Sequence, residues 1–209
     1  MKPCVAKADL EVLDIDMSIK AIIFDCFGVL IVAGHVLMYQ NYPQFQSEFR
    51  NLQDQSDLGK LSRQQFNEAV SKLIGLSPSE VDRQYWSINR FNQLTIDWVR
   101  DLKISGKYKI GLLSNISRDW MDVSLPVFKR EKLFDEMILS GDINIIKPDP
   151  RIFKLMADRF GVLPSECVMI DDVSANIEGA KLAGMQGIVY ASVDQAKAEL
   201  NNLLGLTNA

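Results

Sequence analysis

The feature that most constrains the fold of this sequence is an apolar run that ends in a carboxylate. Residues 21–24 (AIIF) lead directly into Asp25, and Gly28 follows three residues later. A short, unbroken apolar run of this kind predicts a strand that is buried on both faces, as in a parallel sheet. Asp25 would then lie at the carboxyl end of the strand, where open α/β sheets form their ligand-binding crevice. Gly28 would allow the chain to turn sharply just beyond the carboxylate.

The composition of the chain excludes several classes of protein. Its 209 residues suffice for one large domain, or for a core domain with a smaller inserted domain. Hydrophobic residues make up 47% of the chain, which is enough for a substantial buried core. The net charge of −4 argues against nucleic acid as a partner, because a phosphate backbone is bound by a basic surface. No segment approaches the roughly 18 apolar residues of a membrane-spanning helix, so we expect no membrane association.

The cysteines and the N-terminal residues indicate a cytoplasmic protein. Cys4, Cys26 and Cys167 are odd in number and show no metal-ligand spacing, so we interpret them as reduced thiols. Acidic residues interrupt any apolar run within residues 1–16, which therefore do not resemble a signal peptide. We treat residues 1–16 as an N-terminal extension to which no function is assigned.

The chain changes character after the first predicted strand. Residues 31–94 show helical spacing of apolar residues and contain no run typical of a buried strand. Two stretches in this segment, Ser62-Arg63-Gln64-Gln65 and Ser77-Pro78-Ser79-Glu80, fit the capping box that begins many helices. We therefore predict a small helical cap domain over residues 31–94, inserted into a core domain made of residues 17–30 and 95–209.

From residue 95 onward, predicted strands and helices alternate. This alternation is typical of an α/β fold, and it predicts a doubly wound, mostly parallel sheet with helices on both faces. Besides the first strand, the predicted strands are residues 108–113, 136–139, 167–170 and 187–190, and the predicted helices are residues 96–102, 118–132, 150–160 and 176–183, with a terminal helix capped by Ser192.

Polar residues recur after the predicted strands, and they form a chemically coherent set. They are, in chain order, Asp25, Ser114-Asn115, Lys147 and Asp171-Asp172. Because the carboxyl ends of the strands line one crevice in a doubly wound sheet, we expect these side chains to meet. Carboxylates are ligands that Mg²⁺ prefers, while a lysine and a hydroxyl group stabilise negative charge. The set therefore predicts a site for a dianionic group that is bound together with a divalent cation.

Each of these features has a simpler structural explanation when it is taken alone. Ser114-Asn115 suits a helix cap, and Lys147-Pro148-Asp149-Pro150 suits a turn followed by a helix start. Adjacent aspartates are harder to explain in this way, because two neighbouring carboxylates repel each other unless a cation compensates them. The ordered set of four motifs is more specific than any one of them.

The four motifs, in this order, resemble those of the haloacid dehalogenase-like (HAD) hydrolase superfamily. They are Phe24-Asp25-Cys26-Phe27-Gly28-Val29-Leu30, Leu113-Ser114-Asn115, Lys147-Pro148-Asp149-Pro150-Arg151-Ile152-Phe153, and Ile170-Asp171-Asp172 with Asn176. The resemblance covers residues 19–205. The insert after the first strand is similar to the helical cap of subfamily I, particularly over residues 57–66 (DLGKLSRQQF).

The resemblance implies a catalytic role for three residues. Asp25 would be the nucleophile and would form a covalent aspartyl intermediate. Ser114 would donate a hydrogen bond to the transferring group, and Lys147 would balance the charge of Asp25 and the substrate. The implied reaction is hydrolysis of a phosphoester in a small, phosphorylated metabolite.

The resemblance also implies a set of metal and substrate contacts. Asp25, the backbone carbonyl of Phe27 and Asp172, with Asp171 close by, would hold Mg²⁺ as the cofactor. Phe27 and Asn115 would lie beside the substrate. The expected partner is thus a small molecule rather than a macromolecule.

The sequence departs from the phosphatases of this superfamily at one position. Those enzymes carry a second aspartate two residues after the nucleophile as general acid and base, and this chain has Phe27 there. A phenyl ring can neither protonate a leaving alkoxide nor activate water, and such help is worth on the order of 10²–10⁴ in rate. Any phosphatase activity is therefore expected to be weak.

Two alternatives stay open because of this departure. An aromatic residue at this position resembles the dehalogenase branch, whose halide leaving group needs no proton. That branch lacks the paired aspartates and uses an early cap arginine, whereas Asp171-Asp172 is present here and residues 31–49 contain no arginine. The alternatives are a 2-haloacid dehalogenase-like hydrolase and a non-catalytic protein that binds a phosphate ligand.

Overall fold

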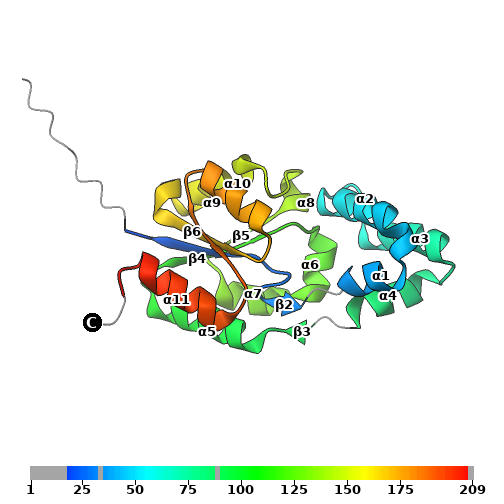
Figure 1. Ribbon diagram of the computed structural model, residues 1–209, viewed down its shortest axis with the longest axis horizontal. Coiled ribbons are helices and arrows are strands. Elements are labelled where there is room, and N and C mark those ends of the chain that lie inside the picture. Colours follow the sequence, from blue (N-terminus) through cyan, green and yellow to red (C-terminus); the bar gives the residue numbers. More distant parts are fainter. Residues whose placement is uncertain (1–17, 33–34, 88–89, 207–209) are drawn as a thin grey trace, which may run out of the picture.

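A five-stranded sheet lies at the centre of the computed structural model, which describes residues 18–32, 35–87 and 90–206 (Figure 1). The predicted extension of residues 1–16 lies outside the described residues. The strand order is β5-β4-β1-β6-β7, and every neighbouring pair is parallel. The strands are β1 (Ala21–Phe24), β4 (Lys109–Ser114), β5 (Glu136–Leu139), β6 (Cys167–Asp171) and β7 (Gln186–Val189).

The direction of strand addition reverses at β1. After β1 the chain proceeds outward through β4 and β5, and it then returns to the other side of β1 for β6 and β7. In an open α/β sheet, this reversal creates a crevice at the carboxyl ends of the strands. The predicted α/β fold with a parallel sheet is therefore confirmed, and the end of β1 lies at the middle of the crevice.

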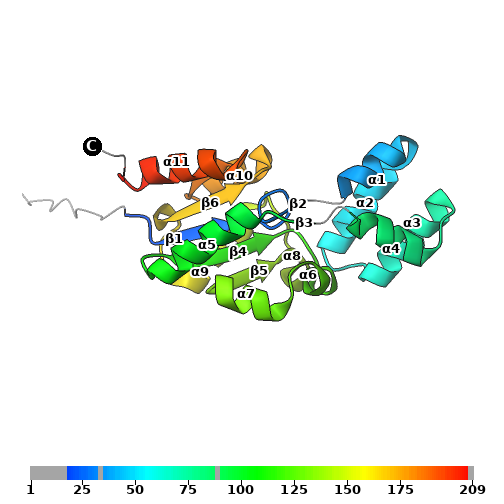
Figure 2. The same cartoon turned by 90° about the horizontal axis from the view of Figure 1, so that it is seen from below.

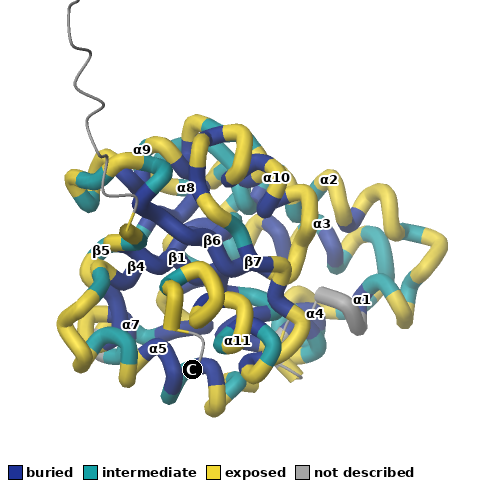
Figure 3. Tube along the Cα trace, turned by 60° about the vertical axis from the view of Figure 1, so that its left-hand side comes forward, coloured by how far each residue is buried: buried dark blue, intermediate teal, exposed yellow. Residues whose placement is uncertain are grey.

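Helices cover both faces of the sheet. Ile22 and Phe24 of β1 belong to the apolar cluster that includes residues of α5 (Gln93–Ser105) and α11 (Val193–Leu203). Ala21 and Ile23 belong to a second cluster with residues of α9 (Pro150–Phe160) and α10 (Ser174–Leu182). Burial on both faces explains the unbroken apolar run of this strand, and Figure 3 shows the strands buried and the outer helices exposed.

No helix within the described ranges is both long and apolar enough to cross a membrane.

The insert between β1 and β4 contains helices and one small sheet. The helices are α1 (His35–Asn41), the 3-10 helix η1 (Pro43–Phe45), α2 (Gln46–Asp57), α3 (Arg63–Ile74) and α4 (Pro78–Trp86), and we refer to them as the cap helices. They lie together at one end of the molecule (Figures 1 and 2). The predicted helical insert after the first strand is confirmed. In addition, β2 (Ile31–Val32) and β3 (Arg90–Phe91) pair in antiparallel fashion where the insert begins and ends. Two residues per strand are too few to produce a recognisable periodicity.

The predicted capping boxes differ in outcome. The box at Ser62 is confirmed, since its hydroxyl accepts a hydrogen bond from the backbone of Gln65 and the Gln65 side chain accepts one from Ser62. Ser77 likewise accepts from the backbone N–H of Glu80 at 3.2 Å. The carboxylate of Glu80, however, accepts from Arg83 instead of from Ser77, so only half of the second box forms. Asp149 caps α9 as predicted, with its carboxylate accepting from the backbone of Arg151.

The single helix predicted over residues 118–132 is two helices in the structure. They are α6 (Arg118–Ser124) and α7 (Val127–Leu133), and Pro126 lies between them. Proline lacks a backbone N–H and clashes with the preceding turn, so it ends the first helix. Two further short segments, α8 (Ser140–Ile143) and the 3-10 helix η2 (Pro164–Glu166), complete the secondary structure of the described residues.

Candidate active site

A buried lysine lies between two carboxylates at the carboxyl edge of the sheet. Lys147 Nζ donates a hydrogen bond to Oδ1 of Asp25 and another to Oδ2 of Asp171, each at 2.6 Å. The side chains of Lys147 and Asp171 are 1% and 0% exposed, and that of Asp25 is 9% exposed. The structure therefore brings together the residue that follows β1, the last residue of β6 and a lysine from the segment after β5.

Asn115 fixes the backbone of this lysine. Its side-chain Nδ2 donates to the carbonyl oxygen of Lys147 at 2.9 Å, and its Oδ1 accepts from the backbone N–H of Lys147 at 2.8 Å. Asn115 follows Ser114, the last residue of β4, so the sheet determines where Lys147 lies. Contact of Asn115 with a substrate stays a prediction, because both ends of its amide already have a protein partner.

The two adjacent aspartates occupy different environments. Asp171 accepts hydrogen bonds from Asn176 Nδ2 at 3.0 Å and from the backbone N–H of Val173 at 2.9 Å, in addition to the one from Lys147. Asp172 is exposed, and its carboxylate lies against Gly28. A Cβ atom at Gly28 would be 2.1 Å from Asp172 Oδ2, so the absence of a side chain there permits the approach. Gly28 also has φ +89°, a conformation that glycine adopts without strain.

Three carboxylates thus converge on one small volume. Oxygen atoms of Asp25, Asp171 and Asp172 lie within 4.8 Å of one another. The ammonium group of Lys147 compensates only one of their three negative charges, and like charges at this distance repel. A hard divalent cation with oxygen ligands would fit this donor set.

Burial and the neighbouring charges shift the protonation equilibria of the site. Burial raises the pKa of Asp25 to about 7, with Asp171 adding to the shift and Lys147 opposing it. Burial and the charge of Asp171 also raise the pKa of Asp172. Burial alone would lower the pKa of Lys147, but the two carboxylates outweigh that effect and hold the pKa above its usual value. A divalent cation among these carboxylates would favour their ionised forms.

Ser114 and Phe27 border this cluster on the β4 side and at the turn after β1. Ser114 is 1% exposed and ends the strand that pairs directly with β1. Phe27 is half-buried, directly precedes Gly28, and packs against the larger apolar cluster. An aromatic ring at this point offers no titratable group to the crevice.

The C-terminal end of α2 contacts the same edge of the sheet. Ser140 Oγ donates to the backbone carbonyl of Asp57 at 2.5 Å and accepts from the backbone N–H of Ile116 at 2.8 Å. Trp120 Nε1 donates to Ser56 Oγ at 3.0 Å. The cap helices are therefore held against the segments that follow β4 and β5.

Sequence reasoning singled out Asp57 only as one residue of a stretch similar to the cap. The available signal is that Asp57 lies two residues before a glycine. In the structure, a Cβ atom at that glycine, Gly59, would be 2.5 Å from the carbonyl oxygen of Gly141. Because Gly59 permits its segment to approach Gly141 closely, the nearby Asp57 is brought close to the segment after β5 as well. That inference needs the three-dimensional position of Gly141, which the sequence does not provide.

Comparison with known proteins by sequence identifies hydrolases. A family model described as haloacid dehalogenase-like hydrolase matches residues 19–184. Pyrophosphatase PpaX of Bacillus cereus (strain AH820) is 23% identical over 179 residues, which cover 80% of this chain and 81% of that protein. Bifunctional epoxide hydrolase 2 of Sus scrofa is 33% identical over 98 residues, which cover 44% of this chain and 18% of that protein.

Solved structures with the same fold include phosphate-binding and dehalogenating enzymes. A HAD family enzyme from Bacteroides thetaiotaomicron superposes with a TM-score of 0.72 at 23% identity, covering 88% of this chain and 98% of that one. The same enzyme in complex with magnesium and inorganic phosphate gives a TM-score of 0.69 at 23% identity, covering 84% and 96%. L-2-haloacid dehalogenase from Xanthobacter autotrophicus gives 0.58 at 20% identity, covering 91% and 84%. Because the family model matches residues 19–184 of the 209, this chain belongs to the haloacid dehalogenase-like hydrolases.

Proposed function

We propose that this protein hydrolyses phosphate esters of small metabolites in a Mg²⁺-dependent reaction, through an aspartyl intermediate on Asp25. The observation that carries the proposal is the position of Lys147, which bonds both Asp25 and Asp171 at 2.6 Å while Asp172 lies nearby. One ammonium group compensates only one of the three carboxylate charges. A divalent cation could compensate the others and bind a dianionic ligand. The complex of the Bacteroides enzyme with magnesium and inorganic phosphate supports this proposal by analogy.

Asp25, Lys147 and Ser114 have separate roles in the proposed reaction. A carboxylate oxygen of Asp25 attacks the phosphorus atom, and the bond from phosphorus to the leaving oxygen breaks. Lys147 orients the nucleophile and reduces its repulsion with the incoming dianion, and the Ser114 hydroxyl donates a hydrogen bond to the transferring group. Water then hydrolyses the aspartyl phosphate and regenerates Asp25.

The proposed metal ligands are Asp25, Asp171, Asp172 and the backbone carbonyl of Phe27. A bound Mg²⁺ would neutralise charge on the phosphoryl oxygens as the substrate binds and reacts. We assign the insert to the subfamily I type of helical cap, with residues 31–94 as the cap domain and residues 17–30 and 95–209 as the core domain. Phe27 favours one alternative, dehalogenase-like chemistry, since a halide leaves without a proton.

A substrate panel distinguishes these functions. The wild-type protein is assayed with alkyl phosphates, aryl phosphates and 2-haloacids, each with and without Mg²⁺, and quenched samples are analysed by mass spectrometry. We expect turnover of phosphate esters only with Mg²⁺, and a mass gain of one phosphoryl group on the peptide that contains Asp25. Metal-independent release of halide would support the dehalogenase alternative instead. Phosphate binding without any turnover would support the non-catalytic alternative.

The metal site can be tested independently of turnover. Mg²⁺ at about 100 times its Kd should stabilise the folded protein by about 2.7 kcal/mol. For a chain of this size, that corresponds to a rise in Tm of roughly 5–10 °C. Asp172→Asn should remove most of this rise, because the variant lacks an exposed carboxylate of the cluster.

The matched control for this measurement is Asp158→Asn, which removes an exposed carboxylate from α9 and should retain the full Mg²⁺ response. Thermal unfolding of the three proteins is followed over a series of Mg²⁺ concentrations. An Asp172→Asn response equal to that of the wild type would show that Asp172 is not a ligand.

A further inference from the structure

We propose that Asp57, at the C-terminal end of α2, is the general acid and base that position 27 does not provide. The inference rests on the proposed phosphatase function and identifies a further catalytic residue for it. A leaving alkoxide needs a proton, and the phenyl ring of Phe27 has none to give. The missing proton must come from another titratable group near the crevice, and the structure holds Asp57 of the cap helices at the carboxyl edge of the sheet.

The backbone of Asp57 is tied to the carboxyl edge of the sheet. Its carbonyl oxygen accepts the 2.5 Å hydrogen bond from Ser140, the residue directly after β5. Ser140 in turn accepts from Ile116, two residues beyond the end of β4. The close approach of Gly59 to Gly141 adds a second contact on the same side. These contacts hold the backbone of Asp57 against the segments that follow β4 and β5.

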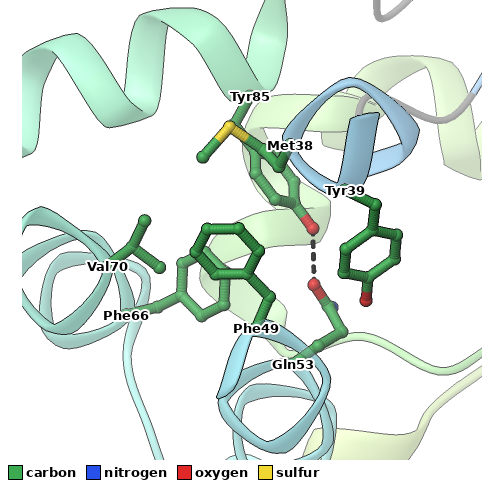
Figure 4. Close-up of a pocket in the computed structure, with 7 residues that line it drawn as sticks. All are labelled: Met38, Tyr39, Phe49, Gln53, Phe66, Val70 and Tyr85. Carbon is green, nitrogen blue, oxygen red and sulfur yellow. Dashed lines mark hydrogen bonds between the residues drawn. The ribbon is translucent and has the colours of Figure 1, made fainter. Parts of the chain in front are cut away.

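The side chain of Asp57 is oriented by a partly buried chain of hydrogen bonds within the cap helices. Gln53, one helical turn earlier on α2, donates from Nε2 to Asp57 Oδ1 at 2.8 Å. Its Oε1 accepts a hydrogen bond from the hydroxyl group of Tyr85 at 2.5 Å, as Figure 4 shows. Because Oδ1 is an acceptor in this chain, a proton on the carboxyl group belongs on Oδ2. No hydrogen bond within the described residues reaches Oδ2, which leaves it available to a substrate.

The polar chain is enclosed by apolar and aromatic side chains. Tyr85 packs against Trp120 at 4.9 Å and against Phe66 at 5.6 Å between ring centroids. The cavity beside Gln53 has a volume of about 10 Å³, which leaves room for at most one water molecule. Figure 4 shows Gln53 and Tyr85 facing each other beside this cavity, whose other lining residues are Met38, Tyr39, Phe49, Phe66 and Val70. Tight packing therefore limits the orientations that Gln53 can offer to Asp57.

The charges around Asp57 suit an acid that acts near neutral pH. Burial raises the pKa of Asp57 to about 8, and Asp54 and Asp25 add to the shift, while Gln53 and Lys147 oppose it. Burial raises the pKa of Tyr39 of α1 and of Tyr85 of α4, and the charge of Asp57 adds to both shifts. Their hydroxyl groups stay protonated at neutral pH, so Asp57 is the neighbour that exchanges a proton there.

The two chemical steps balance with Asp57 in this role. In the first step, Asp25 attacks phosphorus, the bond to the leaving oxygen breaks, and that oxygen takes the proton from Asp57 Oδ2. The alcohol departs neutral, and Asp57 is left ionised. In the second step, Asp57 takes a proton from a water molecule whose oxygen attacks the phosphorus atom. The bond between phosphorus and Asp25 breaks, phosphate is released, and Asp57 is protonated again.

The test compares two leaving groups in the full-length protein with Mg²⁺. The Asp57→Asn variant should hydrolyse the best alkyl phosphate of the substrate panel on the order of 10²–10³ times more slowly than the wild type. Formation of the aspartyl intermediate from 4-nitrophenyl phosphate, measured as a nitrophenolate burst, should slow by less than about tenfold, because nitrophenolate leaves without a proton. A purely structural role of Asp57 would slow both substrates to the same extent.

Three further measurements complete the test. Glu48→Gln removes an exposed carboxylate from the same helix and should leave both rates within about threefold of the wild type. Phe27→Asp placed in the Asp57→Asn background should restore alkyl phosphate hydrolysis by at least about tenfold. Asp57→Asn should also remove the decline of kcat/KM at basic pH, which deprotonation of the acid would cause.

The protonation of Asp57 can also be measured without any substrate. Its pKa is raised from 3.8 to about 8 on folding, so its stabilising contribution is complete below the lower value and is lost as the pH rises through the higher one. The Tm of Asp57→Asn should therefore fall less between pH 5 and pH 9 than that of the wild type.

The outcomes separate this inference from the proposed function. A wild-type protein that hydrolyses no phosphate ester would overturn the proposed function itself. Phosphate ester hydrolysis in which Asp57→Asn leaves the leaving-group ratio and the pH profile unchanged would overturn only the role of Asp57. A folded double variant that Phe27→Asp does not rescue would also contradict that role, because the missing component would then not be an acid and base.

Discussion

Asp25→Asn is expected to reduce kcat by on the order of 10⁴-fold or more for every substrate, whatever the leaving group. An amide oxygen is a poor nucleophile, so the aspartyl intermediate cannot form. This uniform loss differs from the effect expected for Asp57→Asn, which depends on the leaving group. The measurement is kcat for an alkyl and an aryl phosphate, together with mass spectrometry of quenched protein, in which the variant should gain no phosphoryl group.

The Asp25→Asn variant should fold, because the substitution removes one charge from a repulsive cluster. The amide oxygen can still accept the hydrogen bond that Lys147 now donates to Asp25, and Asp171 continues to compensate the lysine. We therefore expect a Tm in the absence of Mg²⁺ that is no lower than that of the wild type.

Glu166→Gln is the matched control for Asp25→Asn. Glu166 is also a buried carboxylate paired with a lysine, Lys20, but it directly precedes β6 and so lies at the amino end of the sheet. This variant should keep the turnover of the wild type at a temperature where it is folded. An Asp25→Asn variant that keeps more than about one-hundredth of the wild-type kcat would show that Asp25 is not the nucleophile.

The central sheet could be predicted because its signals are local. Residues 21–24 are buried by helices on both faces, and complete burial leaves an apolar run without polar interruption. The expected meeting of Asp25, Lys147 and Asp171 followed from the rule that parallel strands end at one edge. Those three residues do lie in contact, so this part of the candidate site was accessible from sequence.

Other features depend on contacts between distant segments and left no local pattern. The strands β2 and β3 exist because residues 31–32 and 90–91 pair across the whole insert. The two hydrogen bonds of Asn115 to Lys147 join residues 32 positions apart. Asp57 lies in the segment for which the sequence predicts only a helical cap, and its relation to the crevice appears once α2 is seen against Ser140. The break between α6 and α7 is different, since Pro126 was a local signal that outweighed the helical spacing around it.

The position of Lys147 leads to the second large effect. Lys147→Met should lower the free energy of unfolding by about 3–5 kcal/mol, because it leaves two buried carboxylates without their compensating charge. For a chain of this size, that corresponds to a fall in Tm of roughly 6–20 °C. Methionine has a similar length and fills the space of the lysine stem, so the loss reports mainly on charge rather than on a cavity. The measurement is thermal unfolding in the absence and presence of Mg²⁺.

The control for Lys147→Met is Lys181→Met on α10. Lys181 bonds Glu178 at 2.9 Å, but the two side chains are 52% and 67% exposed, so water already screens the pair. Its loss should cost less than about 1 kcal/mol. Mg²⁺ should restore part of the stability of Lys147→Met, since a cation between Asp25, Asp171 and Asp172 takes over some of the lost compensation. It should stabilise Lys181→Met no more than it stabilises the wild type.

If both lysine variants lost the same small amount of stability, the carboxylates around Lys147 would have to be protonated in the folded protein. The excess of negative charge on which the metal site depends would then be absent.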